Sequence, residues 1–297
     1  MAKNQRVAIV SFQEHFNKIF KVFIKFGTIE PVVIALICWI IVIIGSLIHD
    51  FHRPPEFYLS DKRNIFNALF AKWCLAWTLA FLTPYMGLTY LVKSKYNLKS
   101  VSKKVLRLVV AVTIWFVVTT VLDWIENLTG ECEGSDLYSK KQECFREGLV
   151  WNGIDISGHS FLLAYCTLII SEEVQVVRYW TNEKIYPNET IYANEKNSPN
   201  KNIYGERIQT NKQIYSNETF QSKSKQEFVS VRCICIVLYI CCCLLMMLWV
   251  TLLVFTAVYF HTTNSKILGI ILALSAWILT YKVYFLSKYF PGAATRF

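Results

Sequence analysis

The sequence predicts an all-α membrane protein with six transmembrane helices and an amphipathic helix at its N-terminus. Three observations lead to this fold class. Hydrophobic residues make up 54% of the 297 residues, charged residues make up only 18%, and the apolar residues come in long uninterrupted runs. A soluble domain would carry about a quarter charged residues, and about 20 apolar residues suffice to cross a membrane as a helix. A soluble enzyme, a disordered regulator and a disulfide-stapled secreted module are therefore excluded.

The N-terminal segment, residues 1–30, is predicted to be cytosolic. Phenylalanines recur in it at helical spacing, with lysines between them, at positions Phe12, Phe16, Phe20 and Phe23. This pattern is typical of an amphipathic helix on a membrane surface, and a simple leader into the first span fits it equally well. Since no small-residue cleavage site follows the first span, we expect it to remain as a signal anchor.

Six apolar runs follow, and each is a candidate transmembrane helix. They cover residues 32–48, 65–92, 105–122, 157–177, 233–260 and 267–286. The fourth run gives the weakest signal, because its uncharged apolar core covers only residues 160–170. Buried core helices of a large soluble protein are the alternative, but six such runs leave too little polar sequence to cover them.

The distribution of basic residues predicts the orientation of these helices. Of the 31 Lys and Arg residues, 23 fall in segments that six spans would place on one face, namely 1–30, 93–107, 171–232 and 281–297. The positive-inside rule makes this face cytosolic, together with both termini. The loop at 123–158 holds eight Asp or Glu against three Lys or Arg, which suits the lumenal face. The net charge of +10 thus indicates topology and attraction to anionic lipid, and no nucleic-acid partner.

The chain divides accordingly into five parts. After the N-terminal segment 1–30, residues 31–180 form the first four spans with a lumenal loop at 123–156. Residues 181–229 are rich in Asn and contain imperfect Ile-Tyr repeats, so we expect a disordered cytosolic insert. Residues 230–287 form the last two spans, and residues 288–297 form a cytosolic tail.

The ten cysteines do not form a disulfide framework. Eight lie in or at the spans, where Cys acts as a small apolar packing residue. Cys132 and Cys144 lie in the lumenal loop, where oxidation is possible. We favour a bridge between them, and two free thiols are the alternative. No Cys has metal-ligand spacing on a loop, so we expect no metal site and no other cofactor.

Four of the five histidines fall on the predicted lumenal side, namely His49, His52, His159 and His261. A histidine at a membrane end is more often an interfacial side chain than a catalyst. His159 differs, because it opens the fourth span directly after Ser157 and Gly158.

The start of the fourth span has the features of an anion site. Ser157 or Asp155 can cap this helix, and the free N–H groups around Gly158 would face an anion in the lumen. A glycine also allows close approach of a phosphate to the backbone. For Asp155 we favour capping over the orientation of a histidine. Lys62 and Arg63, which precede the second span on the same face, would add positive charge.

Ser157-Gly158-His159, with a second histidine at a later helix end, is similar to the motifs of lipid phosphate phosphatases. A wider set of segments resembles the fat storage-inducing transmembrane (FIT) protein family, from about residue 30 to residue 285. These segments are YLSDKRN at 58–64, ENLTG at 126–130, DISGHSFLL at 155–163, Glu172-Glu173, and TAVYFH at 256–261.

The resemblance implies a lipid phosphate phosphatase-like helical bundle in the endoplasmic reticulum membrane, with both termini cytosolic and a lumenal active site. It also implies an acyl-CoA diphosphatase that cleaves the pyrophosphate of long-chain acyl-CoA. The products would be acyl 4′-phosphopantetheine and adenosine 3′,5′-bisphosphate, and the cellular role would be in lipid-droplet formation and membrane lipid balance. The implied partners are long-chain fatty acyl-CoA, neutral lipids and phospholipids of this membrane.

Only His159 and His261 can be transferred from the phosphatases as catalytic residues. Those enzymes place an Arg before the distal histidine and an Asp four residues after it, whereas residues 252–260 lack Arg and Ser265 takes the later position. Ser157, Gly158, Lys62 and Arg63 remain candidate substrate contacts.

A covalent mechanism follows as a hypothesis. Neutral His261 would attack phosphorus, and protonated His159 would give its proton to the leaving oxygen and later activate water. In the competing hypothesis the protein binds triacylglycerol or diacylglycerol and partitions it into droplets without catalysis. Residues 161–163 would then contact lipid, although helix packing is the expected use of these side chains under either hypothesis. We interpret Glu172 and Glu173 as an ordinary cytosolic helix end.

Overall fold

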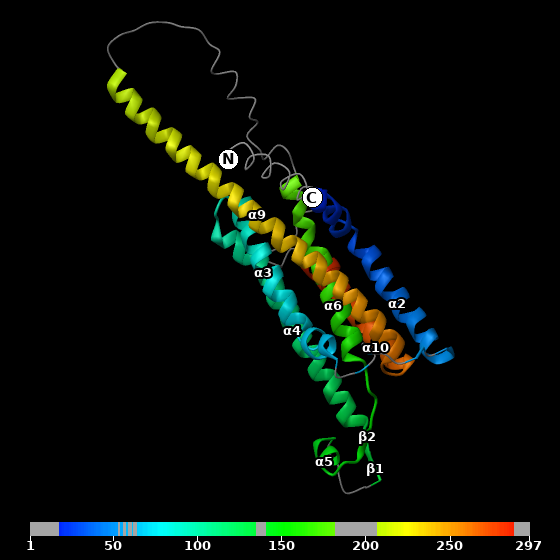
Figure 1. Cartoon of the computed structure of the whole chain (residues 1–297). Coiled ribbons are helices and arrows are strands. Elements are labelled where there is room, and N and C mark those ends of the chain that lie inside the picture. The colour runs from blue at the N-terminus through cyan, green and yellow to red at the C-terminus, as the bar shows by residue number, and fades with distance from the viewer. Residues whose placement is uncertain are drawn as a thin grey trace.

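The computed structural model describes residues 18–52, 54, 55, 58, 61, 64–134, 141–181 and 207–287, with the backbone alone for 180, 181 and 207–229 (Figure 1). This part of the chain is mostly helical. Six of its helices are long and apolar enough to cross a membrane, which confirms the predicted fold class and number of spans.

The first span and the helix before it pack against later parts of the chain. Residues 18–27 are helical, and α2 follows over Pro31–Phe51, with Pro31 in the first turn where a missing N–H costs nothing. Phe20 packs edge-on against Tyr239 with 5.9 Å between ring centres. The hydroxyl of Tyr239 donates a hydrogen bond to the carbonyl oxygen of Phe23 at 2.9 Å. Phe12 and Phe16 of the predicted amphipathic helix lie outside the described residues.

The second predicted run, residues 65–92, is not one continuous helix. A π-helical segment, η2 (Phe66–Ala71), is followed by a break at Lys72 and Trp73, and the span itself is α3 (Cys74–Lys93). Lys72 is exposed at this break. The apolar run therefore contains two elements, η2 and α3.

The third span, α4 (Leu98–Thr129), extends seven residues beyond the predicted run 105–122 at each end. The side chain of Asn97 accepts hydrogen bonds from the backbone N–H groups of Lys99 and Ser100, and it thereby caps the first turn. The basic residues in the first turns of α4 interrupt the apolar run, but they are good helix formers, so the helix begins before the apolar run does.

The loop after α4 contains the only strands in the part of the chain that the structure describes. The strands β1 (Glu131–Glu133) and β2 (Val150–Asn152) pair antiparallel, and the short helix α5 (Lys141–Arg146) lies between them in sequence. A disulfide joins Cys132 to Cys144, so the favoured alternative for these two residues is confirmed. The strands were not expected, because three residues are too few for an alternating pattern.

The fourth span is the centre of the bundle. It consists of α6 (Gly158–Glu173) and η3 (Val174–Val177), and the short helix α7 (Arg178–Thr181) continues it. In an apolar stretch of 18 residues within this span, 83% of the residues are buried, against 22–44% in the corresponding stretches of the other five spans. Helices α2, α3, α9 and α10 surround it. Because protein rather than lipid covers this helix, it accommodates buried polar residues, which explains its weak hydrophobic signal.

The last two spans are α9 and α10. Helix α9 covers Arg207–Tyr259, and its stretch Ser230–Tyr259 is the fifth candidate span. It begins inside the segment 181–229 that the composition predicts to be disordered, and residues 182–206 lie outside the described residues. Helix α10 (Thr263–Trp277) is continued by η5 (Ile278–Val283) and η6 (Tyr284–Leu286), and together they form the sixth span.

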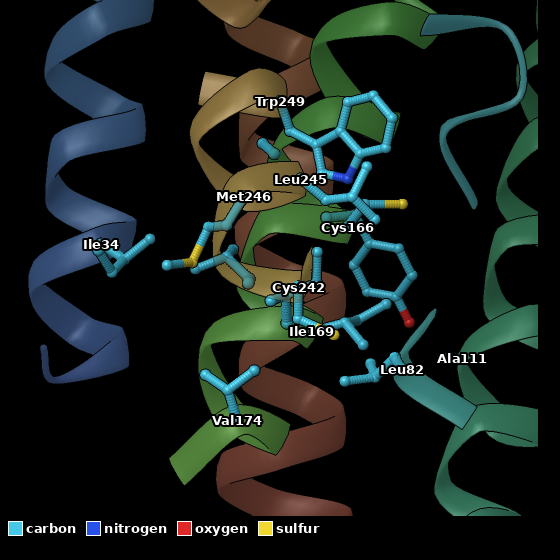
Figure 2. Packing of buried hydrophobic residues seen from close by; sticks show 14 of the residues in the cluster. Ile34, Leu82, Ala111, Cys166, Ile169, Val174, Cys242, Leu245, Met246 and Trp249 are labelled. Carbon is cyan, nitrogen blue, oxygen red and sulfur yellow. The ribbon is translucent and has the colours of Figure 1, made fainter. Parts of the chain in front are cut away.

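The hydrophobic core lies where α6, α9 and α3 meet, as Figure 2 shows for Cys166, Leu82 and Trp249 among others. The indole Nε1 of Trp249 donates a hydrogen bond to Oγ1 of Thr78 at 3.1 Å, which satisfies both buried groups. Phe161 and Leu163 are fully buried, and Phe161 stacks on Tyr165. These side chains pack within the protein, which is the use expected of them under either hypothesis.

Glu172 and Glu173 are not an ordinary helix end. Nε of Arg107 lies 3.1 Å from Oε1 of Glu173, and both side chains are buried. Nζ of Lys282 lies 2.6 Å from Oε1 of Glu172. The two carboxylates thus join α6 to α4 and to η5, because a buried charge needs a partner of opposite sign.

Candidate active site

Ser157, one of the two predicted caps, lies at the start of α6. Ser157 is the N-cap residue, and its Oγ accepts hydrogen bonds from the backbone N–H of Ser160 at 3.2 Å and from Oγ of Ser160 at 3.0 Å. The N–H groups of Gly158 and His159 belong to the first turn and have no acceptor within the helix. No atom lies within 4 Å of the position that a Cβ on Gly158 would take. The positive end of the central helix therefore opens onto free space at Gly158.

Ser157 itself is fully buried. Because its hydroxyl caps α6, Ser157 holds the start of the helix in place and does not line the open part of the site.

The second histidine lies in the turn between α9 and α10. His261 adopts a φ of 57°, in the left-handed region that costs a non-glycine residue free energy. Its Nδ1 lies 2.7 Å from Oδ2 of Asp155, two residues before the N-cap of α6. The imidazole is 21% exposed and the carboxylate is 54% exposed, so both face the outside of the bundle. An unusual backbone conformation held by a specific side-chain contact is typical of functional sites.

Our expectation that Asp155 caps α6 was wrong. Ser157 holds the N-cap position, and the carboxylate of Asp155 instead contacts His261, 106 residues further along the chain. The one available signal was that Ser265 stands four residues after His261, where lipid phosphate phosphatases have an Asp. The carboxylate comes from the α6 side of the site rather than from α10.

Several hydrogen bonds fix the α9–α10 turn against α6. The hydroxyl of Ser265 donates a hydrogen bond to the carbonyl oxygen of Asp155, and the backbone N–H of Ser157 donates to the carbonyl oxygen of Ser265 at 3.1 Å. Gly269, one turn further along α10, lies against Ser157: a Cβ at this position would be 2.6 Å from its carbonyl oxygen. The absence of a side chain at Gly269 therefore allows the two helices to approach here.

The end of α2 joins the same network. Nδ1 of His49 lies 2.9 Å from Oδ1 of Asp50, and the hydroxyl of Thr263 donates a hydrogen bond to Oδ2 of Asp50 at 2.7 Å. Below them Lys266 is fully buried, and its Nζ donates to the carbonyl oxygen of Ala257 at 2.8 Å. Neither Asp50 nor Lys266 was predicted from the sequence to belong to the site. A basic residue early in the sixth span was the one available signal for Lys266.

The structure thus brings together the elements that carry His159 and His261. The first turn of α6 and the α9–α10 turn are hydrogen-bonded neighbours at one end of the bundle, beside the end of α2 (Figure 1). Lys62 and Arg63 lie outside the described residues. Among the described residues, no three His, Cys, Asp or Glu side chains are grouped so that they could hold a metal ion.

Comparison with known proteins shows to which family the chain belongs. The sequence profile described as "Fat storage-inducing transmembrane protein" matches residues 55–281, about three quarters of the chain. The chain belongs to this family.

Among similar proteins is "Acyl-coenzyme A diphosphatase FITM2" of Bos taurus, 32% identical over 256 residues that cover 84% of this chain and 80% of the relative. The protein of the same name from Homo sapiens is 31% identical with the same coverage. That from Xenopus tropicalis is 32% identical over 272 residues, or 88% of this chain and 84% of the relative. No solved structure matches the chain.

Proposed function

We propose that this FIT protein is an acyl-CoA diphosphatase of the endoplasmic reticulum membrane that cleaves the pyrophosphate of long-chain fatty acyl-CoA at the lumenal face. The products are acyl 4′-phosphopantetheine and adenosine 3′,5′-bisphosphate, and the activity supports lipid-droplet formation and membrane lipid balance. The observation that carries the proposal is the contact between His261 and Asp155 beside the open N-terminus of α6. The name that the relatives carry supports the choice of substrate.

In this proposal His261 is the nucleophile. When the Nδ1–H group donates a hydrogen bond to the carboxylate of Asp155, the other ring nitrogen, Nε2, keeps its lone pair. Nε2 attacks one phosphorus atom of the pyrophosphate, a nitrogen–phosphorus bond forms, and the bond from that phosphorus to the bridging oxygen breaks. Asp155 fixes the tautomer and stabilises the positive charge that develops on the ring.

His159 is the general acid and then the general base. It gives its proton to the oxygen of the departing phosphate, and it then takes a proton from water, which attacks the phosphohistidine and restores His261. The N–H groups of the first turn of α6 lie where they would stabilise negative charge on the equatorial oxygens, together with the dipole of the central helix. The acyl chain of the substrate would remain in the hydrocarbon of the membrane.

The test is turnover of oleoyl-CoA by the purified protein, with adenosine 3′,5′-bisphosphate measured by chromatography. We expect His261→Ala and His159→Ala each to lower kcat by more than about 1,000-fold, as loss of a nucleophile or its proton donor does in other hydrolases. His52→Ala is the matched control, because His52 ends α2 at the same end of the bundle and is exposed. Unchanged turnover in both site variants would refute the roles of the two histidines, and no turnover by the unaltered protein would refute the enzymatic proposal.

The non-enzymatic alternative, in which the protein partitions triacylglycerol or diacylglycerol into droplets, is tested with the same variants in cells. If the variants lose turnover and still support droplet formation, lipid partitioning is a separate activity of the chain. The structure removes one argument for this alternative, because Phe161 and Leu163 are buried within the bundle.

A further inference from the structure

The turn that carries His261 follows an unusual helix end. Helix α9 ends at Tyr259 and is extended by a hydrogen bond from the backbone N–H of Phe260 to the carbonyl oxygen of Thr256 at 3.2 Å. His261 then takes the left-handed conformation that commonly ends a helix, although glycine usually occupies this position. In such helix ends a backbone N–H of the turn donates to a carbonyl of the last helical turn, which here is that of Ala257.

A side chain makes this contact instead of a backbone group. Nζ of Lys266, near the start of α10, donates a hydrogen bond to the carbonyl oxygen of Ala257 at 2.8 Å. The donor comes from nine residues further along the chain, so Lys266 reaches back over the whole turn that contains His261. The dipole of α9 also favours a positive charge at this end of the helix.

The carbonyl end of α9 is closed to water. Ala257 and Lys266 are both fully buried. On the side of α2, Gly45 packs so closely that a Cβ there would be 2.5 Å from the Cβ of Ala257. A buried carbonyl oxygen that loses its donor costs free energy. If the ammonium group of Lys266 were removed, we therefore expect a backbone N–H of the turn to replace it.

Asp50 holds the other side of the turn. The hydroxyl of Thr263 donates a hydrogen bond to Oδ2 of Asp50 at 2.7 Å, which ties the turn to the end of α2. The carboxylate of Asp50 also attracts the ammonium group of Lys266. The side chain of Asp50 is 45% exposed, so it stays hydrated while it balances a buried positive charge. Lys266 and Asp50 thus constrain the turn from two sides.

We propose that Lys266 is a positioning residue for His261. By occupying the carbonyl oxygen of Ala257, its ammonium group keeps the backbone N–H groups of the turn from closing on the end of α9. The turn thereby keeps the shape in which the imidazole of His261 contacts Asp155. This inference rests on the proposed role of His261 as the nucleophile. Lys266 acts through His261, because it is buried and does not line the open part of the site.

The test is Lys266→Met, which removes the ammonium group and keeps the length of the side chain. A backbone N–H should then take the carbonyl oxygen of Ala257, and the turn should tighten and draw His261 away from Asp155. We expect kcat for oleoyl-CoA to fall roughly 10- to 100-fold, since a displacement of about 1 Å at a site can cost that much. KM should stay nearly unchanged, because the substitution moves the nucleophile and leaves the substrate contacts in place.

Hydrogen–deuterium exchange of the purified protein in detergent measures the turn itself. We expect the backbone amides of His261 and Thr262 together to exchange more slowly in Lys266→Met, because one of them gains a hydrogen bond. The thermal midpoint should change little, because burial of an apolar side chain in place of a charge offsets the lost contact. A purely structural role for Lys266 would give the opposite pattern, with faster exchange in the turn and a lower midpoint.

Lys282→Met is the matched control, because it removes another lysine from the sixth span, at the opposite end from the candidate active site. It breaks the contact with Glu172, and we expect kcat and the exchange of the α9–α10 turn to stay the same. Lys266→Arg keeps a cation that can donate to the carbonyl oxygen of Ala257, so it should recover part of the lost kcat.

Two results would overturn the proposal. The first is normal kcat in Lys266→Met, and the second is a loss of kcat that comes with faster exchange and a lower midpoint. If the unaltered protein did not turn over oleoyl-CoA, the proposed function would fail instead. Exchange of His261 and Thr262 would then decide the role of Lys266 alone, and faster or unchanged exchange in Lys266→Met would refute it.

Discussion

His261 combines a strained backbone conformation with a proposed role in catalysis. Its left-handed backbone costs free energy, on the order of 1 kcal/mol or more, and such a cost persists only where surrounding contacts fix the conformation. Those contacts are the carboxylate of Asp155 and the hydrogen bonds of Ser265 to the segment before α6. The turn is therefore held in one shape before any substrate arrives, which is the condition for a positioned nucleophile.

The contact with Asp155 gives the first prediction. Asp155→Asn keeps the size of the side chain but offers a neutral amide, which no longer selects the tautomer with the proton on Nδ1. We expect kcat for oleoyl-CoA to fall at least about 100-fold with KM nearly unchanged, because the residue acts on the nucleophile rather than on substrate binding.

A purely structural role for Asp155 would give a different result. The carboxylate is more than half exposed, so its contact with His261 adds little to the free energy of unfolding, and the thermal midpoint should stay the same. Asp155→Glu, which keeps the acceptor, should recover part of the lost kcat. A variant with normal kcat, or one whose lost activity follows lost stability, would show that Asp155 does not position His261.

At the scale of elements, the candidate active site depends on how closely α10 approaches the start of α6. Gly269 allows this approach, because any side chain there would meet the carbonyl oxygen of Ser157 and the Cβ of Ser160. In membranes, small residues at helix interfaces provide this kind of contact. The close helix contact that Gly269 allows is therefore needed for the contact between Asp155 and His261.

The second prediction concerns this glycine. Gly269→Ala should push α10 away from α6, separate Asp155 from His261, and lower the turnover of oleoyl-CoA at least about tenfold, since displacements of about 1 Å at a site cost that much. The strain of one added methyl group should lower the free energy of unfolding by about 1–3 kcal/mol. Turnover and the thermal midpoint in detergent measure the two effects.

Gly87→Ala is the control for the chemistry of the substitution. Gly87 lies inside α3, and no atom lies within 4 Å of its missing Cβ. We expect normal turnover and an unchanged or slightly raised midpoint, because alanine favours the helix. If Gly269→Ala behaved in the same way, the close approach of α10 to α6 would not matter for the site.

At the scale of the whole molecule, the sequence predicts which segments cross the membrane better than it predicts how they meet. Long apolar runs locate all six spans, because a helix in lipid needs an apolar surface along its length. The predicted run 65–92 includes the break before α3, and the charged residues near both ends of α4 end a hydropathy run without ending the helix. Lys72 marks a break, whereas Lys99 and Lys104 lie inside α4.

Contacts between residues far apart in the chain were not predictable from local patterns. The histidines could be placed at one end of the bundle, because alternating spans put every second loop on the same face. The partner of His261 could not be predicted, because the sequence around Asp155 suits a helix cap and an ion pair equally well. Glu173 was misread for a similar reason: Arg107, which pairs with it, lies 66 residues earlier in the chain.

The orientation of the whole bundle is the third prediction. The α3–α4 turn should face the cytosol and the α9–α10 turn should face the lumen, because 23 of the 31 Lys and Arg residues fall in segments on the side of the α3–α4 turn. Exposed positions in both turns allow a direct measurement with cysteine labelling: Lys95→Cys at the first turn and Asn264→Cys at the second. Exposed Cys233 is replaced by Ser in both variants, and the Cys132–Cys144 disulfide does not react with maleimide.

In sealed microsomes, whose cytosolic face is outside, a membrane-impermeant maleimide should label Lys95→Cys at once. It should label Asn264→Cys only after detergent opens the vesicles. The reverse pattern would place His261 and Asp155 in the cytosol. Cytosolic acyl-CoA would then reach the histidines without crossing the membrane. One labelling experiment therefore decides in which compartment the proposed active site works.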